Sequence, residues 1–150
     1  MAKRKDTKLE SEGAEFLVLG HLLIEGIHCY KAYVNFPGYD LQAVNPKTGK
    51  TVKIQVKSRW ATDYDKSFSI KNFDCDFVIH VALNRGDSFS KAVKKGDSKT
   101  SPIFYVWPVK EVRKAREKQN SFNKVKIKKI RSVEKPENNW QLIRDFLEKK

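Results

Sequence analysis

The chain has 150 residues, enough for one domain with a hydrophobic core and too few for two ordinary domains. Its 31 Lys and Arg residues outnumber its 18 Asp and Glu residues, which gives a formal net charge of +13. Such a surplus favours a polyanionic partner, and nucleic acid is favoured over a membrane surface because no basic helix with a broad apolar face is evident. A lysine-rich surface that only confers solubility is the alternative interpretation.

The sequence also indicates where the protein works. No apolar segment approaches the roughly 20 residues that span a bilayer, and the basic first residues are not followed by a hydrophobic signal region. Cys29 and Cys75 lie in apolar runs, which suits small buried thiols in a reducing compartment better than a disulfide. We therefore expect a cytoplasmic protein, with residues 1–8 as a disordered basic tail and residues 9–150 as a single domain.

The first predicted element is a helix from about Ser11 to Gly26, where the glycine is a typical stop signal. Its apolar residues form a wide face that we expect to pack against a sheet, leaving a narrow polar strip. These apolar residues are Phe16, Leu17, Leu19, Leu22, Leu23 and Ile24. Glu12 and Glu15 lie on the strip, where acids in the first turn can be favoured by the helix dipole alone.

A β-hairpin is predicted from Tyr39 to Arg59, after a β-rich segment at 27–36. Residues 39–44 and 51–59 alternate polar and apolar side chains, and the break between them reads Asn-Pro-Lys-Thr-Gly. Alternation places Gln55 and Lys57 on one face of the second strand, while Asp40 opens the first. A carboxylate, an amide oxygen and an ammonium group are thus expected on the polar side of a short sheet.

The rest of the chain predicts a sheet covered by helices. The predicted elements are a central strand at 73–83, a loop at 84–101, a strand at 103–107, a helix after Pro108 and a closing helix at 137–150. Asp74 and Asp76 are interpreted as turn residues that lead into the central strand. The lysine alternation at 124–131 predicts an edge strand protected from aggregation, a strip that tracks phosphates, or both.

These elements predict an α/β domain with a mixed central sheet of about five strands. The first helix is expected on one side of the sheet, and the helices after Pro108 and Pro136 on the other. His21 and His28 have no partner at metal-ligand spacing, so we expect them to be ordinary core or surface residues.

At the hairpin the sequence resembles the PD-(D/E)XK nuclease superfamily, which includes many restriction enzymes, junction resolvases and one lineage of homing endonucleases. Asp40 stands where the family has an Asp opening one strand, and Gln55-Val56-Lys57 stands where it has an acid-x-Lys triplet on the partner strand. The family's helical glutamate is matched by Glu15. The sequence departs from the family pattern at 37–39, which reads Pro-Gly-Tyr before the Asp, and at Gln55, which replaces the acid.

This resemblance, which covers roughly residues 11–112, implies a restriction-endonuclease-like core and a Mg²⁺-dependent DNA endonuclease of restriction, homing or junction-resolving type. It implies that Asp40, Gln55 and the Val56 carbonyl hold Mg²⁺, for which Mn²⁺ could substitute. Lys57 would orient the attacking water or stabilise developing charge, and Glu15 would hold a metal-bound water or a second ion. No organic cofactor is expected.

The expected partner is DNA, bound by basic residues and one aromatic residue. The predicted DNA-binding residues are Lys53, Arg59, Trp60, Lys124, Lys126, Lys128, Lys129 and Arg131. Because a double-strand cut needs two active sites, we expect a homo-oligomer, at least a dimer. The alternative is a nucleic-acid-binding protein on the same fold that has lost cleavage together with its acid. An RNA-binding module is disfavoured because the aromatic strand signature of such modules is missing.

Overall fold

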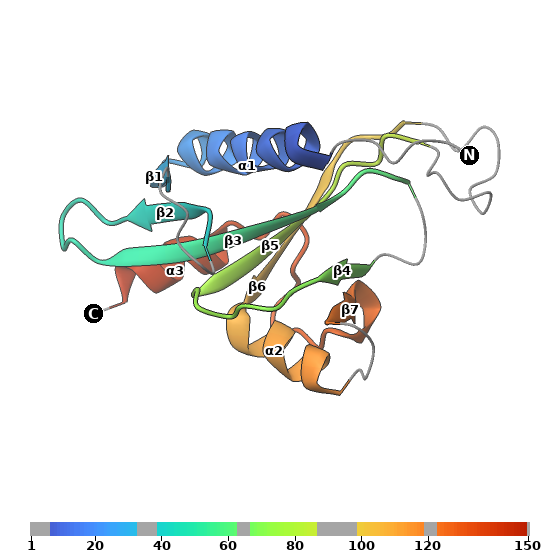
Figure 1. Cartoon of the computed structure of the whole chain (residues 1–150). Helices are drawn as coiled ribbons and strands as arrows, with labels where there is room; N and C mark the ends of the chain where they lie inside the picture. The colour runs from blue at the N-terminus through green and yellow to red at the C-terminus, as the bar shows by residue number, and fades with distance from the viewer. Residues whose placement is uncertain (1–6, 33–38, 63–66, 87–98, 119–122, 150) are drawn as a thin grey trace.

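The computed structural model describes residues 7–32, 39–62, 67–86, 99–118 and 123–149 (Figure 1). Within these residues a five-stranded sheet has the order β1-β2-β3-β5-β6, with β3 and β5 parallel and the other pairs antiparallel. Its strands are β1 (His28–Lys31), β2 (Leu41–Val44), β3 (Thr51–Arg59), β5 (Phe77–Ala82) and β6 (Ile103–Pro108). The predicted mixed α/β fold is therefore confirmed. The predicted β-rich residues 33–36 lie outside the described part of the chain.

Three α-helices flank this sheet in the described residues: α1 (Thr7–Ile24), α2 (Val109–Glu117) and α3 (Gln141–Glu148). α1 begins earlier than predicted, so Thr7 and Lys8 belong to the helix and not to a tail. It ends where predicted, because Gly26 adopts a positive φ of 79° that lets the N–H of Ile27 donate to the carbonyl of Leu22. No helix in the described residues is long and apolar enough to cross a membrane.

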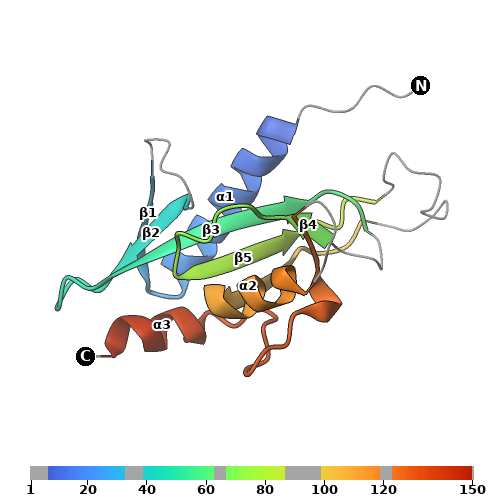
Figure 2. The same cartoon turned by 60° about the horizontal axis from the view of Figure 1, so that its bottom comes forward.

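The sheet separates two apolar clusters. Figure 2 shows α1 and α2 on opposite sides of this sheet. α1 and α3 pack on one face, where Val18 and Ile143 meet Ile54 and Ile79, and α2 packs on the other. The expectation that α3 lies opposite α1 is wrong. The Trp140 ring, at the start of α3, stacks on His21 of α1 at a centroid distance of 5.5 Å, so the apolar side of α3 joins the α1 face.

The interior strand β5 is buried along its whole length, as its continuous apolar run predicts. The expectation for α1 is only partly correct, since Ala14, Val18 and Leu22 are buried. A helix lying on a sheet buries one stripe; Leu19 packs beside this stripe and is half-buried, while the other apolar residues of α1 are exposed. The exposed ones are Leu9, Phe16, Leu17, Leu23 and Ile24.

The lysine alternation at 124–131 forms less strand than predicted. Only β7 (Lys124–Lys126) is a strand, and it pairs with β4 (Ser67–Ser69) in a separate two-stranded sheet. A single 3-10 turn, η1 (Ile127–Lys129), follows because the N–H of Ile130 donates to the carbonyl of Ile127. Cys29 and Cys75 are free thiols, as expected.

Candidate active site

The candidate site lies where β2 stops pairing with β3. The β2–β3 register ends at Ile54, whereas β3 continues to Arg59 alongside β5. Asp40 sits just before β2 and is held from two directions. Its N–H donates to the carbonyl of Ile54 over 2.8 Å, and its Oδ2 accepts a hydrogen bond of 2.8 Å from the N–H of Val56. The Asp40 carboxylate is thereby fixed beside the second half of β3.

A cavity of about 620 Å³ opens at this edge of the sheet. All four residues predicted to be catalytic line it: Glu15, Asp40, Gln55 and Lys57. They come from three places in the chain, namely the N-terminal half of α1, the residue before β2, and the middle of β3. The structure therefore brings the predicted residues together in one concave site.

Gln55 has an unusual environment for an amide. The residue is 9% exposed, and its buried Oε1 has no hydrogen-bond partner among the described residues. Buried polar atoms are nearly always hydrogen-bonded, and an unsatisfied one costs about 1–3 kcal/mol. An oxygen ligand position for a cation, or a hydrogen bond from a bound molecule, would satisfy this atom.

The carbonyl of Val56 provides a further oxygen at the same edge. In a strand, the N–H and C=O of one residue point to the same side, so that a paired residue exchanges both bonds with its neighbour. The N–H of Val56 points to Asp40, and its carbonyl therefore faces the same open edge. Val56 also lines the cavity, which is necessary if its carbonyl is to act as the expected metal ligand.

Glu15 and Asp40 form a closely spaced acidic pair. Burial raises the pKa of Glu15 to about 7, and the Asp40 carboxylate adds to this shift by charge repulsion and by a hydrogen bond. Lys31 opposes the shift, with its ammonium nitrogen 3.8 Å from Glu15 Oε2. Glu12 also raises the pKa of Glu15, and it forms its own ion pair with Lys31. Negative charges this close are relieved by a proton or by a cation.

Lys57 lies on the same face of β3 as Gln55. Burial lowers the pKa of its ammonium group, and the nearby Asp40 carboxylate partly restores it. Lys57 is thus a desolvated cation close to the acidic pair.

No family model matches the chain, and none of the curated proteins does. Among solved structures, it is similar to a bacterial homing endonuclease, I-Ssp6803I, over 95% of this chain and 94% of that one. The TM-score is 0.59 and the sequence identity 20%. The chain has a nuclease-like fold.

On this nuclease-like fold the predicted DNA-binding residues divide into two groups. Arg59, Trp60 and Lys124 line the cavity. The others lie outside it. Lys53 is near the opposite end of β3, with its ammonium 5.3 Å from the ring centroid of Tyr39. Lys126 shares a side of β7 with Lys124, while Lys128, Lys129 and Arg131 follow on an exposed surface.

Sequence reasoning missed residues that support the site. Lys31 is buried although charged, and it holds Glu12 and Glu15 in place. The alternation of side chains along β1 could have indicated this burial, because Lys31 falls on the same side of the strand as the half-buried Cys29. Glu10 lines the cavity and accepts a hydrogen bond of 3.3 Å from the hydroxyl of Ser58.

Two acids outside the site have structural roles, as predicted. Asp76 Oδ2 accepts a hydrogen bond of 2.8 Å from the N–H of Lys53, and Asp74 belongs to a turn in which its N–H donates to Asn72 Oδ1. In the described residues, no three or more His, Cys, Asp or Glu side chains gather as a metal cluster. The oxygens of the residues predicted to hold metal or water instead belong to two carboxylates, one amide and one backbone carbonyl, with the Glu10 carboxylate also lining the cavity.

Proposed function

We propose that this chain is a metal-dependent DNA endonuclease with a PD-(D/E)XK-type site. The observation that carries this proposal is the buried Oε1 of Gln55, which lacks a hydrogen-bond partner in the described structure and lines the same cavity as Asp40, Lys57 and Glu15. The nuclease-like fold supports the proposal, since the structural neighbour is a homing endonuclease.

The donor set fits Mg²⁺, which takes oxygen ligands and keeps several waters, and Mn²⁺ would take the same ligands. Asp40 and Gln55 would hold the ion through side-chain oxygens, and Val56 through its carbonyl. When bound, the ion supplies positive charge to the phosphoryl group and a route to a nucleophile at neutral pH. With an amide in place of an acid the site carries less negative charge, so we expect weak binding of the ion without DNA.

The chain's own residues would orient the reaction. Lys57, a desolvated ammonium, would donate to the attacking water or to a phosphoryl oxygen as negative charge develops there. Glu15, with a pKa near 7, would hold a water or a second ion beside Asp40. Arg59 and Lys124 at the cavity would contact backbone phosphates, and Trp60 would stack on a base or support the strand end.

A second function is a DNA-binding protein without cleavage activity. Gln55 itself favours it, because the family pattern has an acid at this position and the replacement removes one negative charge from the site. The basic surface would serve this function equally well.

Incubation of supercoiled plasmid, linear DNA and four-way junctions with Mg²⁺, Mn²⁺ or EDTA tests the proposal. Wild type should cut at least one substrate with a metal and none with EDTA. Asp40→Asn should reduce cleavage by orders of magnitude, whereas Asp74→Asn, the same change in an exposed turn, should not. DNA binding without cutting of any substrate in either metal would establish the second function instead.

A further inference from the structure

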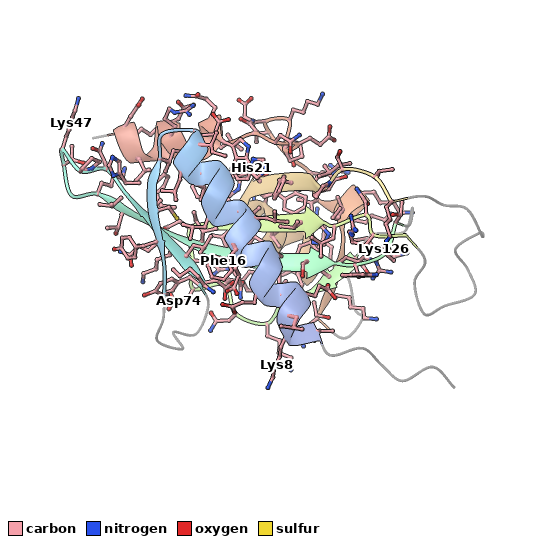
Figure 3. All side chains as sticks on the ribbon, turned by 90° about the horizontal axis from the view of Figure 1, so that it is seen from above. Lys8, Phe16, His21, Lys47, Asp74 and Lys126 are labelled. Carbon is pink, nitrogen blue, oxygen red and sulfur yellow. The ribbon has the colours of Figure 1, made fainter. Side chains whose placement is uncertain are left out.

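One side of α1 is apolar and uncovered. Opposite the buried stripe of Ala14, Val18 and Leu22, every position on the helix is apolar or glycine. We call this surface the outer face of α1. It consists of Leu9 (82% exposed), Gly13, Phe16 (51%), Leu17 (39%), Gly20, Leu23 (52%) and Ile24 (83%). In Figure 3 the helix lies on the near side of the molecule, over the sheet.

This concentration is unusual within the described residues. Seven large apolar side chains there are exposed, and five of them belong to the outer face, the others being Tyr30 and Val133. Scattered apolar residues on a surface are normal, but a contiguous patch of this kind marks an interaction site. A partner is therefore needed to remove this surface from water.

The arrangement of the outer face points to a second copy of the same chain. When two α1 helices pack antiparallel around a two-fold axis between Phe16 and Leu17, Leu9 lies level with Ile24 of the other copy. In the same arrangement, Gly13 lies level with Gly20 of the other copy. At these positions large side chains lie level with large ones and glycines with glycines, and Leu23 lies level with Glu10 of the other copy. A two-fold interface requires such self-complementarity, because the same patch must serve both partners.

The two glycines allow a close approach of the helices. A Cβ added at Gly13 or Gly20 would meet no atom within 4 Å, so neither glycine is required by the packing of a single copy. A glycine in a helix interior lowers helix stability relative to other residues. Two such positions on one uncovered face are therefore explained by contact with another backbone.

A groove beside α1 completes the surface. It has a volume of about 600 Å³ and is mainly apolar, with Leu9, Leu17, Trp60 and Leu83 among its lining residues. The antiparallel arrangement brings Ile24 of the other copy level with this groove. The groove matters because α1 is only about 27 Å long, and one helix face covers less than the roughly 800 Å² per partner of a standard interface.

The helix dipoles agree with an antiparallel arrangement. In two antiparallel copies the dipoles of the α1 helices oppose each other, whereas in a parallel pair they would lie side by side in the same direction.

We infer that the outer face of α1 is a self-association surface on which two copies pack antiparallel as a two-fold dimer. This inference does not depend on cleavage activity. If the proposed nuclease function also holds, the dimer carries two cavities in one particle, as a double-strand cut requires.

Sedimentation equilibrium of the full chain from about 1 to 100 µM tests the dimer. Wild type should show a concentration-dependent dimer, and Gly20→Gln and Ile24→Gln should each weaken it at least tenfold. Gly20→Gln should raise the melting temperature measured at the lowest concentration, because glutamine favours the helix more than glycine does. Loss of association would then not reflect misfolding. Lys47→Gln, at the far end of the β2–β3 hairpin, is the matched control and should leave association unchanged (Figure 3).

Cysteine crosslinking tests the register. A mixture of Gly13→Cys and Gly20→Cys chains should crosslink under mild oxidation, whereas each variant alone should not exceed wild type, whose Cys29 and Cys75 set the background. Within the antiparallel dimer the two copies of one glycine lie about 10 Å apart along the axis, beyond the roughly 7 Å limit for a disulfide. A wild type that stays monomeric at 100 µM, or glutamine variants that dimerise like wild type, would overturn the inference. Crosslinking of each variant with itself would overturn the antiparallel register.

Discussion

The carboxylate of Asp40 accepts a hydrogen bond of 2.8 Å from the backbone N–H of Val56, the central residue of the Gln55-Val56-Lys57 triplet. This contact joins the two halves of the proposed site, because it fixes the acid that precedes β2 against the strand that carries the amide and the ammonium. The same carboxylate also shares a hydrogen bond with Glu15, so Asp40 links α1 to this strand as well.

The first prediction concerns Asp40, which accepts the hydrogen bond from Val56 and is also proposed to bind the metal ion. Asp40→Asn keeps an oxygen that can accept the bond from Val56, so we expect a large loss of cleavage with a stability change under about 1 kcal/mol. Asp40→Ala removes the acceptor and should cost about 1–2 kcal/mol in addition. Urea unfolding of both variants, alongside plasmid nicking, measures the two effects. Equal stability losses in both variants would show that the bond to Val56 does not stabilise the fold.

We expect Lys57 to lower the stability of the folded protein although cleavage requires it. Burial lowers the pKa of this ammonium, so the folded protein bears part of the desolvation cost of its charge. Lys57→Met should abolish cleavage and leave the melting temperature at pH 7 equal to or above that of wild type. Lys71→Met, at an exposed position, is the matched control and should keep activity. A clear loss of stability in Lys57→Met would indicate a structural role for the lysine.

Glu15 predicts a pH dependence of stability. Its pKa is about 7 in the folded protein and near 4.5 in the absence of the fold. The folded state therefore binds more protons in this range, and its stability should fall as pH rises from about 4.5 through 7. Glu15→Gln removes this loss.

Thermal melts at pH 5 and pH 8 test the sign. Relative to wild type, Glu15→Gln should gain stability between pH 5 and pH 8, while Glu148→Gln, an exposed acid on α3, should show no such gain. An equal difference from wild type at both pH values would contradict the raised pKa of Glu15.

The exposed cations after β7 should act on DNA without sequence preference. Lys128 and Lys129 lie on η1, outside the cavity and open to solvent. Changing both to Gln should weaken DNA binding about equally on any sequence and reduce the slope of log K against log salt by about 0.9 for each lost phosphate contact. Binding titrations at several salt concentrations measure this. A changed sequence preference with an unchanged slope would assign the two lysines to base recognition.

Much of the sheet and the grouping of the site residues could be predicted from local patterns. Alternation along β3 puts Gln55 and Lys57 on one face, and the hairpin turn fixes the register that brings Asp40 beside them. The continuous apolar run of β5 identifies it as the buried central strand. These features depend on the spacing of apolar residues along the chain and on the residues that form turns, and both can be read from a single sequence.

Other features depend on packing that a single sequence does not show. α1 is apolar on nearly all sides, so its pattern could not tell which stripe meets the sheet and which remains exposed. The side chosen by α3 depends on the path of the chain after Pro136, whose carbonyl accepts a bond from the N–H of Val106. The ion pairs of the buried Lys31 with Glu12 and Glu15 depend on the position of α1 over β1.

The central claim is that the unsatisfied oxygen of Gln55 is a metal ligand in a working nuclease. Calorimetric titration of Mn²⁺ into wild type, Gln55→Glu and Gln55→Ala, beside plasmid nicking by the same proteins, tests it most directly. We predict that Gln55→Glu binds the ion more tightly than wild type and still cuts, because it keeps the ligand position and adds a negative charge. Gln55→Ala should bind more weakly and fail to cut. Indistinguishable Mn²⁺ affinity and nicking across the three proteins would contradict the site.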